Sequence, residues 1–163
     1  MKNFSIKHFL TTGISFGLTS AVITTLGLMV GLNSSTRSKL AVIGGILIIA
    51  IADAFSDAFG IHISEESENN HKEKEVWLVT ICTFLAKLLF AITFIFPVLF
   101  FSLKKAVIIN IIWGLFLISI LSFYLATTQE RKPFKVIFEH LIIAIIVIFL
   151  SNYIGRLISY FFS

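Results

Sequence analysis

Long stretches of this sequence carry almost no charge, and no other feature constrains its fold as strongly. Residues 9–36 and 106–129 contain no charged side chain, and residues 76–103 contain only Lys87. A helix that crosses the hydrocarbon core of a bilayer, which is about 30 Å thick, needs about 20 mostly apolar residues. Five segments meet this requirement, and they predict membrane-spanning helices at about 9–32, 40–63, 76–103, 106–128 and 134–161.

Composition and backbone chemistry agree on the fold class. Charged residues make up 13% of the chain, whereas soluble domains contain about 25%. Inside lipid, backbone groups must bond to one another, which favours helices, and the strand alternation of a β-barrel is not seen. We therefore expect an all-α, multi-pass integral membrane protein in which residues 1–163 form a single transmembrane domain. The first apolar segment is too long for a cleaved signal peptide, so it is expected to stay as a helix.

Lys and Arg residues in the connections predict the orientation. Cytoplasmic loops carry an excess of these residues. With the N-terminus in the cytoplasm, that side holds seven of them and the other side five. The seven are Lys2, Lys7, Lys72, Lys74, Arg131, Lys132 and Lys135, and the five are Arg37, Lys39, Lys104, Lys105 and Arg156. The count favours a cytoplasmic N-terminus and an external C-terminus.

Small residues recur on one face of the first predicted helix, in steps of four and three. They are Gly13, Gly17, Ser20, Thr24, Gly27 and Gly31. Small side chains let membrane helices approach closely, because packing drives their association. Two alternatives stay open: this face packs within its own subunit, or it forms a homodimer interface or lines a path. Gly60 belongs to an equivalent stripe on the second helix, which also contains Asp53 and Asp57.

Asp53 and Asp57 are four residues apart, so their carboxylates are neighbours on the second predicted helix. A charge near the bilayer centre costs at least about 2.5–3.5 kcal/mol, so the pair requires a partner, a proton or a cation. Carboxylate oxygens suit hard or borderline divalent cations. Because two like charges so close together disfavour simultaneous ionisation, a cation that binds here would displace a proton. This interpretation places both residues on an ion or proton path.

Lys87 supports the alternative interpretation. At a rise of 1.5 Å per residue, it lies at the same depth below the cytoplasmic face as Asp53. An Asp53–Lys87 pair would neutralise both groups and could be purely structural. The two interpretations are compatible if Lys87 acts as a surrogate cation that is displaced during transport.

Acidic residues gather in the connection that follows the second helix. His62, Glu65 and Glu66 share a helical face, Glu68 lies nearby, and His71 and Glu75 have i,i+4 spacing. This segment is either a solvated extension of the helix or an acidic entrance that concentrates cations by its local field. The metal-binding candidates are therefore Asp53, Asp57, His62, Glu65, Glu66 and Glu68.

Several classes of function lack support in the sequence. It contains no hydrolase, zinc-protease or nucleotide-binding signature, and basic residues do not alternate with exposed aromatic ones. The single cysteine, Cys82, excludes a disulfide framework and a Cys-based zinc site. We expect no enzymatic activity, no catalytic residue, no cofactor and no nucleic-acid partner.

Three segments resemble motifs of the vacuolar iron transporter (CCC1-like) family. Residues 16–27, FGLTSAVITTLG, resemble its first-helix motif F-G-L-N-D-G-L-V-T-T-F-G. Residues 55–64, FSDAFGIHIS, are similar to its second-helix motif L-S-M-A-A-G-E-Y-V-S, and residues 153–157, YIGRL, to the Y-L-I-G-R stretch that closes its fifth helix. The helix count, the acidic connection and the predicted orientation agree with this resemblance.

The resemblance implies a homodimer that exports Fe²⁺ or Mn²⁺ from the cytosol, in exchange for protons. Its path would run between subunits along helices one and two, which carry Ser20, Thr24 and the two aspartates. Ser20 stands where the family has Asp, and Asp57 where it has Met; the family's long metal-binding insertion is absent. A carboxylate in place of a thioether favours harder ions such as Mn²⁺ or Mg²⁺. The competing hypothesis is a non-transporting membrane protein on the same fold.

Overall fold

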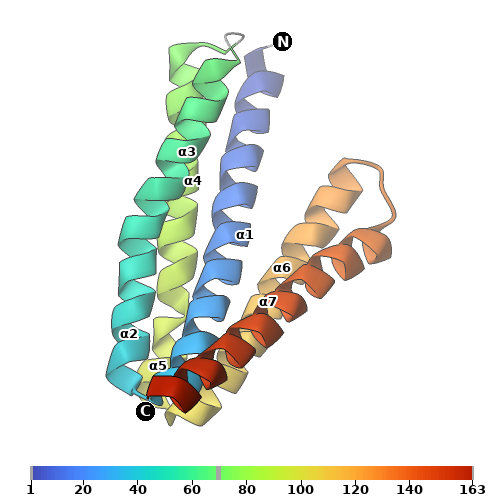
Figure 1. Cartoon of the computed structure of the whole chain (residues 1–163). Helices are drawn as coiled ribbons and strands as arrows, with labels where there is room; N and C mark the ends of the chain where they lie inside the picture. Colours follow the sequence, from blue (N-terminus) through green and yellow to red (C-terminus); the bar gives the residue numbers. More distant parts are fainter. Residues whose placement is uncertain (1, 69–70, 163) are drawn as a thin grey trace. The chain divides into compact units, whose positions relative to one another are not determined.

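A computed structural model describes residues 2–68 and 71–162 of the chain. The structure is 92% helical, and the described residues include no strand. The elements are α1 (Lys2–Thr36), α2 (Lys39–Ile48), a π-helical turn η1 (Ile49–Asp53), α3 (Ala54–Ser67), α4 (Glu73–Thr93), α5 (Ile95–Phe100), α6 (Leu103–Thr128) and α7 (Pro133–Phe162). Figure 1 shows their order along the chain.

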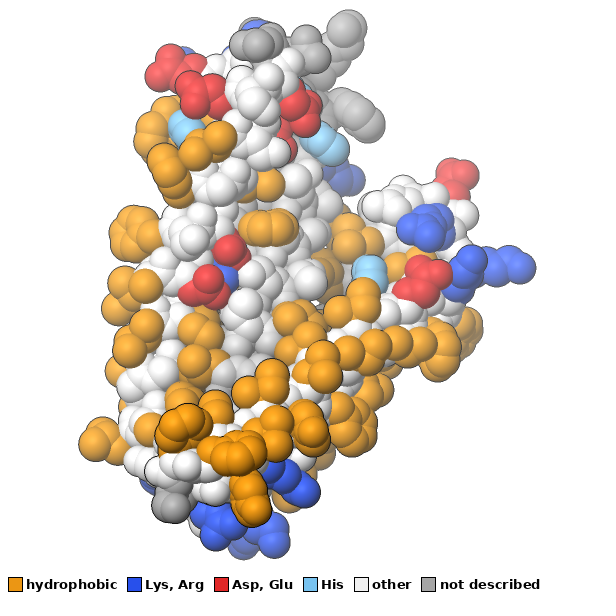
Figure 2. All heavy atoms as spheres, viewed as in Figure 1, with side chains coloured by type: hydrophobic (Ala, Val, Ile, Leu, Met, Phe, Trp, Pro, Cys, Tyr) orange, Lys and Arg blue, Asp and Glu red, His pale blue; other side chains and the backbone are white. Residues whose placement is uncertain are grey.

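Five helical segments among the described residues are long and apolar enough to cross a membrane. They are Ile6–Thr36, Lys39–Ser67, Glu73–Phe100, Leu103–Thr128 and Pro133–Phe162. In Figure 2, hydrophobic side chains lie along the helices, and most charged side chains lie near helix ends. Many of these apolar side chains are exposed, for example Phe138, Ile146 and Phe149 on α7. The structure thus supports the all-α class and an integral membrane protein.

The third and fourth spans meet at a different point from the predicted one. The sequence places the break at residues 104–105, but the helix ends at Phe100 and α6 begins at Leu103. Phe101 and Ser102 adopt extended backbone conformations, with ψ of 166° and 146°, which stops the helix. Lys104 and Lys105 therefore lie in the first turn of α6 and not in a loop.

Two spans contain irregular turns that the hydrophobic pattern does not indicate. The second span passes from α2 through η1 into α3 without leaving the helix. The third span is interrupted at Phe94, between α4 and α5. Pro97 explains this break, because proline has no N–H to donate to the carbonyl of Thr93 and its ring crowds that carbonyl.

The chain divides into two compact units, which are described separately. The first comprises Met1–Ala21 and Leu47–Thr93, and the second comprises Val22–Ile46 and Phe94–Ser163. In the first unit, α3 and α4 pack together, and the buried residues Ala21, Ala50 and Ala91 form a small-residue core. In the second unit, α6 and α7 form an antiparallel pair (Figure 1).

The glycines of α1 pack against helices of the same chain. In the first unit, a Cβ atom on Gly13 would lie 2.7 Å from the carbonyl oxygen of Val79, and one on Gly17 would lie 2.6 Å from that of Thr83. In the second unit, a Cβ on Gly27 would lie 3.1 Å from Val147 of α7, and one on Gly31 would lie 3.6 Å from Ser151. These contacts favour packing within the subunit over a dimer interface on this face.

Gly60 of α3 differs from these four glycines. A Cβ atom at this position would have no heavy atom within 4 Å. The predicted role of Gly60 in close helix packing is therefore wrong within the chain. The position faces open space because it lies on an exposed part of α3.

Candidate functional site: a buried lysine between two aspartates

The described charges at mid-span converge on one lysine in the first unit. Asp53 is the last residue of η1 and lies 14 residues from each end of its span, Lys39–Ser67. Lys87 of α4 lies 14 residues after the start of its own span at Glu73. Because a short connection joins these antiparallel helices, equal distances from it place the two side chains at one depth, about 21 Å along the axis. Part-way along the first unit, Figure 2 shows acidic side chains gathered around a basic one.

The ammonium group of Lys87 contacts three oxygen atoms. Its Nζ lies 2.5 Å from Oδ2 of Asp53 and forms a second ion pair with Oδ2 of Asp57. It also donates a hydrogen bond of 2.8 Å to Oγ of Ser20 on α1. A lysine ammonium has three N–H donors and no acceptor, so each of its donors has one oxygen partner.

Ser20 connects the lysine to one of the carboxylates. While its Oγ accepts from Lys87, its hydroxyl donates to Oδ2 of Asp57 at 2.5 Å. The network therefore joins three helical segments of the first unit: the first half of α1, the η1–α3 junction and α4. A hydroxyl can serve both neighbours at once because it both donates and accepts.

Burial is unequal across this network. The side chain of Lys87 is fully buried, whereas those of Asp53 and Asp57 remain 34% and 19% exposed. One ammonium and two carboxylates carry a net charge of −1 when all three are ionised. The lysine therefore neutralises only one carboxylate, and the exposed side of the cluster consists of carboxylate.

The backbone at Asp53 is a π-helical turn, which sequence reasoning did not predict. Such single turns add one residue to a helix and occur frequently at functional sites. Upstream of the turn, Ile46 is buried, as is Ala50 within it; downstream, Gly60 and Ser64 are exposed. The stripe that the sequence places on one face thus passes from a buried to an exposed environment, with the two aspartates in between.

The ion pair with Asp53 agrees with the predicted depths of the two helices. Asp57 and Ser20 were not predicted as partners of Lys87, although each was singled out as a path residue or metal ligand. The same depth argument could have signalled Asp57, since it lies one turn from Asp53. Thr24, the other predicted path residue, belongs to the second unit.

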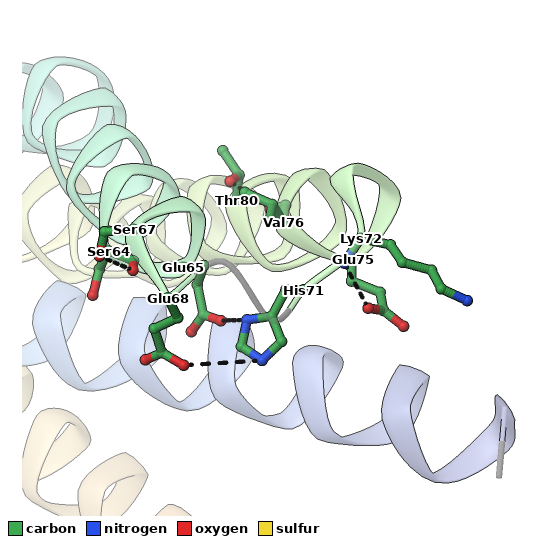
Figure 3. Close-up of polar contacts among 9 residues, drawn as sticks. All are labelled: Ser64, Glu65, Ser67, Glu68, His71, Lys72, Glu75, Val76 and Thr80. Carbon is green, nitrogen blue, oxygen red and sulfur yellow. Dashed lines mark hydrogen bonds and ion pairs between the residues drawn. The ribbon is translucent and has the colours of Figure 1, made fainter.

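A second polar group surrounds His71 at the end of α3. Its Nδ1 lies 2.9 Å from Oε2 of Glu65, and its Nε2 lies 4.0 Å from Oε2 of Glu68. Figure 3 shows the imidazole ring of His71 between these two carboxylates. The predicted i,i+4 pair of His71 and Glu75 is wrong, because Glu75 instead accepts a 3.0 Å hydrogen bond from the backbone N–H of Lys72. A hydrogen bond to the free N–H next to the start of α4 outcompetes the longer reach to the ring.

His62 and Glu66 lie apart from the His71 pairs. Nδ1 of His62 is 2.9 Å from Oγ1 of Thr80, and its ring stacks on Trp77 with a centroid separation of 4.7 Å. Both His62 and Glu66 line a cavity of about 460 Å³, together with His71, Glu73, Val76 and Trp77. The predicted acidic entrance thus consists of a His71-centred pair of glutamates beside a small hollow.

A complete metal site is not formed by the described side chains. Among residues 2–68 and 71–162, no three or more His, Cys, Asp or Glu side chains are grouped so that they could hold a metal ion. Asp53 and Asp57 supply two carboxylates with a lysine between them. The assignment of Asp53, Asp57, His62, Glu65, Glu66 and Glu68 as metal ligands stays a prediction.

No protein-family model matches this chain, and no curated protein matches it. The chemistry of the site is therefore argued from its own residues.

Proposed function

We propose that this protein is a secondary transporter that moves a divalent metal cation of the iron or manganese class out of the cytosol, in exchange for protons. The observation that carries this proposal is the buried Lys87 ammonium bound by Asp53, Asp57 and Ser20 at mid-span. Ionisable groups inside the bilayer are costly, and they mark ion paths and proton relays.

The charge of the cluster supports exchange. With Lys87 protonated and both carboxylates ionised, the cluster has a charge of −1, which favours uptake of a cation. A divalent ion on the two carboxylates would repel the adjacent ammonium, so its binding would favour loss of the lysine proton. Uptake of the metal would then release a proton, and its departure would allow Lys87 to take a proton and pair with the aspartates again.

Each residue has a defined part in this proposal. Asp53 and Asp57 supply the carboxylate oxygens that hard and borderline divalent ions prefer. Ser20 orients Asp57 through its hydrogen bond. Lys87 is the surrogate cation that keeps the carboxylates paired between transport cycles.

The exposure of the two aspartates supports a path beside α3. A carboxylate in contact with lipid near the bilayer centre would cost about 2.5–3.5 kcal/mol. A water-filled path or a second copy of this chain on that face would remove this cost. We therefore place the path along the first two spans of a homodimer, with Ser20 and Thr24 on it. The resemblance to the vacuolar iron transporter family and the cytoplasmic N-terminus belong to the same proposal.

A non-transporting membrane protein is the second candidate. It is favoured by the complete burial of Lys87 and by the engagement of all three of its donors. In that case the cluster fixes the packing of three helices and does not exchange its lysine.

Flux measurements on reconstituted protein separate the two candidates. We expect wild-type proteoliposomes to take up Mn²⁺ and to move protons in the opposite direction, and Asp57→Asn to abolish both fluxes. The matched control is Glu139→Gln, which removes an exposed carboxylate on α7 and should leave both fluxes unchanged. Unchanged Mn²⁺ flux in Asp57→Asn would refute the site, and absence of Mn²⁺, Fe²⁺ and Mg²⁺ flux in the wild type would favour the second candidate.

A further inference from the structure

A polar cavity of about 1000 Å³ lies in the second unit, where three helix ends meet. The end of α1, the first turn of α6 and the end of α7 form it. Its lining residues are Asn33, Ser34, Arg37, Leu103, Lys104, Asn152, Arg156, Ser159 and Tyr160. Because the cavity lies at the ends of membrane-spanning helices, it belongs to the boundary between lipid and water.

The charge around this cavity is entirely positive. Arg37, Lys104 and Arg156 line it, and Lys39 and Lys105 adjoin it in sequence. The second unit contains two acidic residues, Glu130 and Glu139. Both lie where α6 connects to α7, at the opposite ends of these helices, and Glu139 lies 4.0 Å from Arg131 there. No carboxylate of this unit is therefore available to neutralise the cations of the cavity.

The uncharged groups of the cavity also favour an anion. Ser34 donates a 2.6 Å hydrogen bond to Oδ1 of Asn152, so Asn152 presents its amide N–H₂ as a donor. The side chain of Ser102 forms no hydrogen bond that caps α6, and the first residues of that helix line the cavity. A helix N-terminus offers backbone N–H groups and the positive end of the helix dipole to an anion.

The backbone at Arg37 is held in the left-handed region, with a φ of 52°. This conformation costs a residue with a side chain about 1–2 kcal/mol, and such outliers concentrate at functional sites. Arg37 follows α1 directly, and its N–H donates to the carbonyl oxygen of Asn33 at 3.2 Å. A glycine would adopt this turn at lower cost, so the presence of arginine is explained if its guanidinium binds a ligand.

We propose that this cavity binds a phosphate group, carried by the headgroup of an anionic membrane lipid or present as the free ion. Guanidinium groups bind phosphate oxygens in a bidentate manner, and two of them line this cavity together with a lysine. Tyr160 lines it as well, and tyrosines are enriched at the level of lipid headgroups. This site does not involve Asp53, Asp57 or Lys87, and it does not depend on metal transport.

Binding measurements on the full chain test this site. Native mass spectrometry of the detergent-solubilised protein would compare retention of phosphatidylglycerol with that of phosphatidylcholine, and a thermal-shift assay would compare inorganic phosphate with chloride at equal ionic strength. We expect Arg156→Gln and Arg37→Gln each to weaken binding about fivefold. Arg131→Gln, which removes an arginine of the same unit at its other end, is the matched control.

The outcomes distinguish the two sources of phosphate. Selective retention of phosphatidylglycerol that both variants weaken would support a lipid headgroup. Stabilisation by inorganic phosphate that the variants reduce, without lipid selectivity, would support the free ion. Equal retention of the two lipids with no stabilisation by phosphate would overturn the proposal, as would equal losses in Arg131→Gln. Arg37→Gln serves as an independent test if Arg156→Gln fails to fold.

Discussion

Replacement of Lys87 by methionine is the perturbation for which the structure gives the clearest expectation. Methionine retains much of the length and apolar character of the lysine side chain but removes its charge. The fully buried ammonium loses ion pairs with Asp53 and Asp57 and a hydrogen bond with Ser20. Removal of one partner from a buried ion pair costs about 3–5 kcal/mol, because the other charge stays unpaired.

The exposure of the carboxylates reduces this cost. Asp53 is 34% and Asp57 19% exposed, so each can be partly solvated or can take up a proton. We therefore expect a loss of about 3 kcal/mol, at the lower end of that range. For a chain of this size, this corresponds to a fall of about 6–12 °C in the melting temperature.

The assay is thermal unfolding in mild detergent, and Lys74→Met is the matched control. Lys74 lies on the same helix, α4, but is exposed, so its replacement should change the melting temperature very little. An equal melting temperature for Lys87→Met and Lys74→Met would refute the reasoning, because it would mean that the ammonium of Lys87 does not stabilise the fold.

Two further predictions concern the glycines and the acidic connection. Gly17→Ala should destabilise the protein by about 1–3 kcal/mol, because the new Cβ would meet the Thr83 carbonyl at 2.6 Å, whereas Gly60→Ala should be neutral or stabilising by up to about 1 kcal/mol; equal melting temperatures would contradict the assigned packing. Replacement of Glu65, Glu66 and Glu68 by glutamine should raise the apparent KM for Mn²⁺ at low ionic strength with little change in maximal rate, and high salt should remove the difference. A KM difference that persists in high salt would exclude steering by the local field.

Much of the fold follows from where charges are absent. Hydrophobic length sets the number of spans, because each must match the thickness of the bilayer. The breaks within and between spans depend on the backbone and are less visible. Pro97 could have signalled the interruption at Phe94, whereas the extended conformations of Phe101 and Ser102 carry no marker in composition.

The site was predictable in depth but not in rotation about the helix axes. Asp53 and Lys87 lie at equal distances from a short connection, so their pairing follows from helix rise alone. Whether Asp57 also faces Lys87 depends on how α3 is rotated after the π-helical turn. The participation of Ser20 requires knowing that the first half of α1 lies beside α4, which the close contacts of Gly13 and Gly17 with that helix provide.

The glycine stripe illustrates the same difference between depth and neighbourhood. A regular spacing of small residues predicts that another helix approaches closely, but it does not identify that helix. In the structure, Gly13 and Gly17 contact α4, and Gly27 contacts α7. One stripe thus serves two neighbours of the same chain.

Neutralisation of the whole cluster separates stability from transport. In the variant with Lys87→Met, Asp53→Asn and Asp57→Asn together, no buried charge lacks a partner, and replacement of buried ion pairs by neutral groups is often neutral or stabilising. We therefore expect its melting temperature to recover most of the loss seen in Lys87→Met alone. Transport requires the carboxylates themselves, so the same variant should show no Mn²⁺ flux in proteoliposomes. A stable triple variant that still transports Mn²⁺ would place the path elsewhere in the protein, whereas a triple variant no more stable than Lys87→Met would show that the ion pairs are themselves required for the fold.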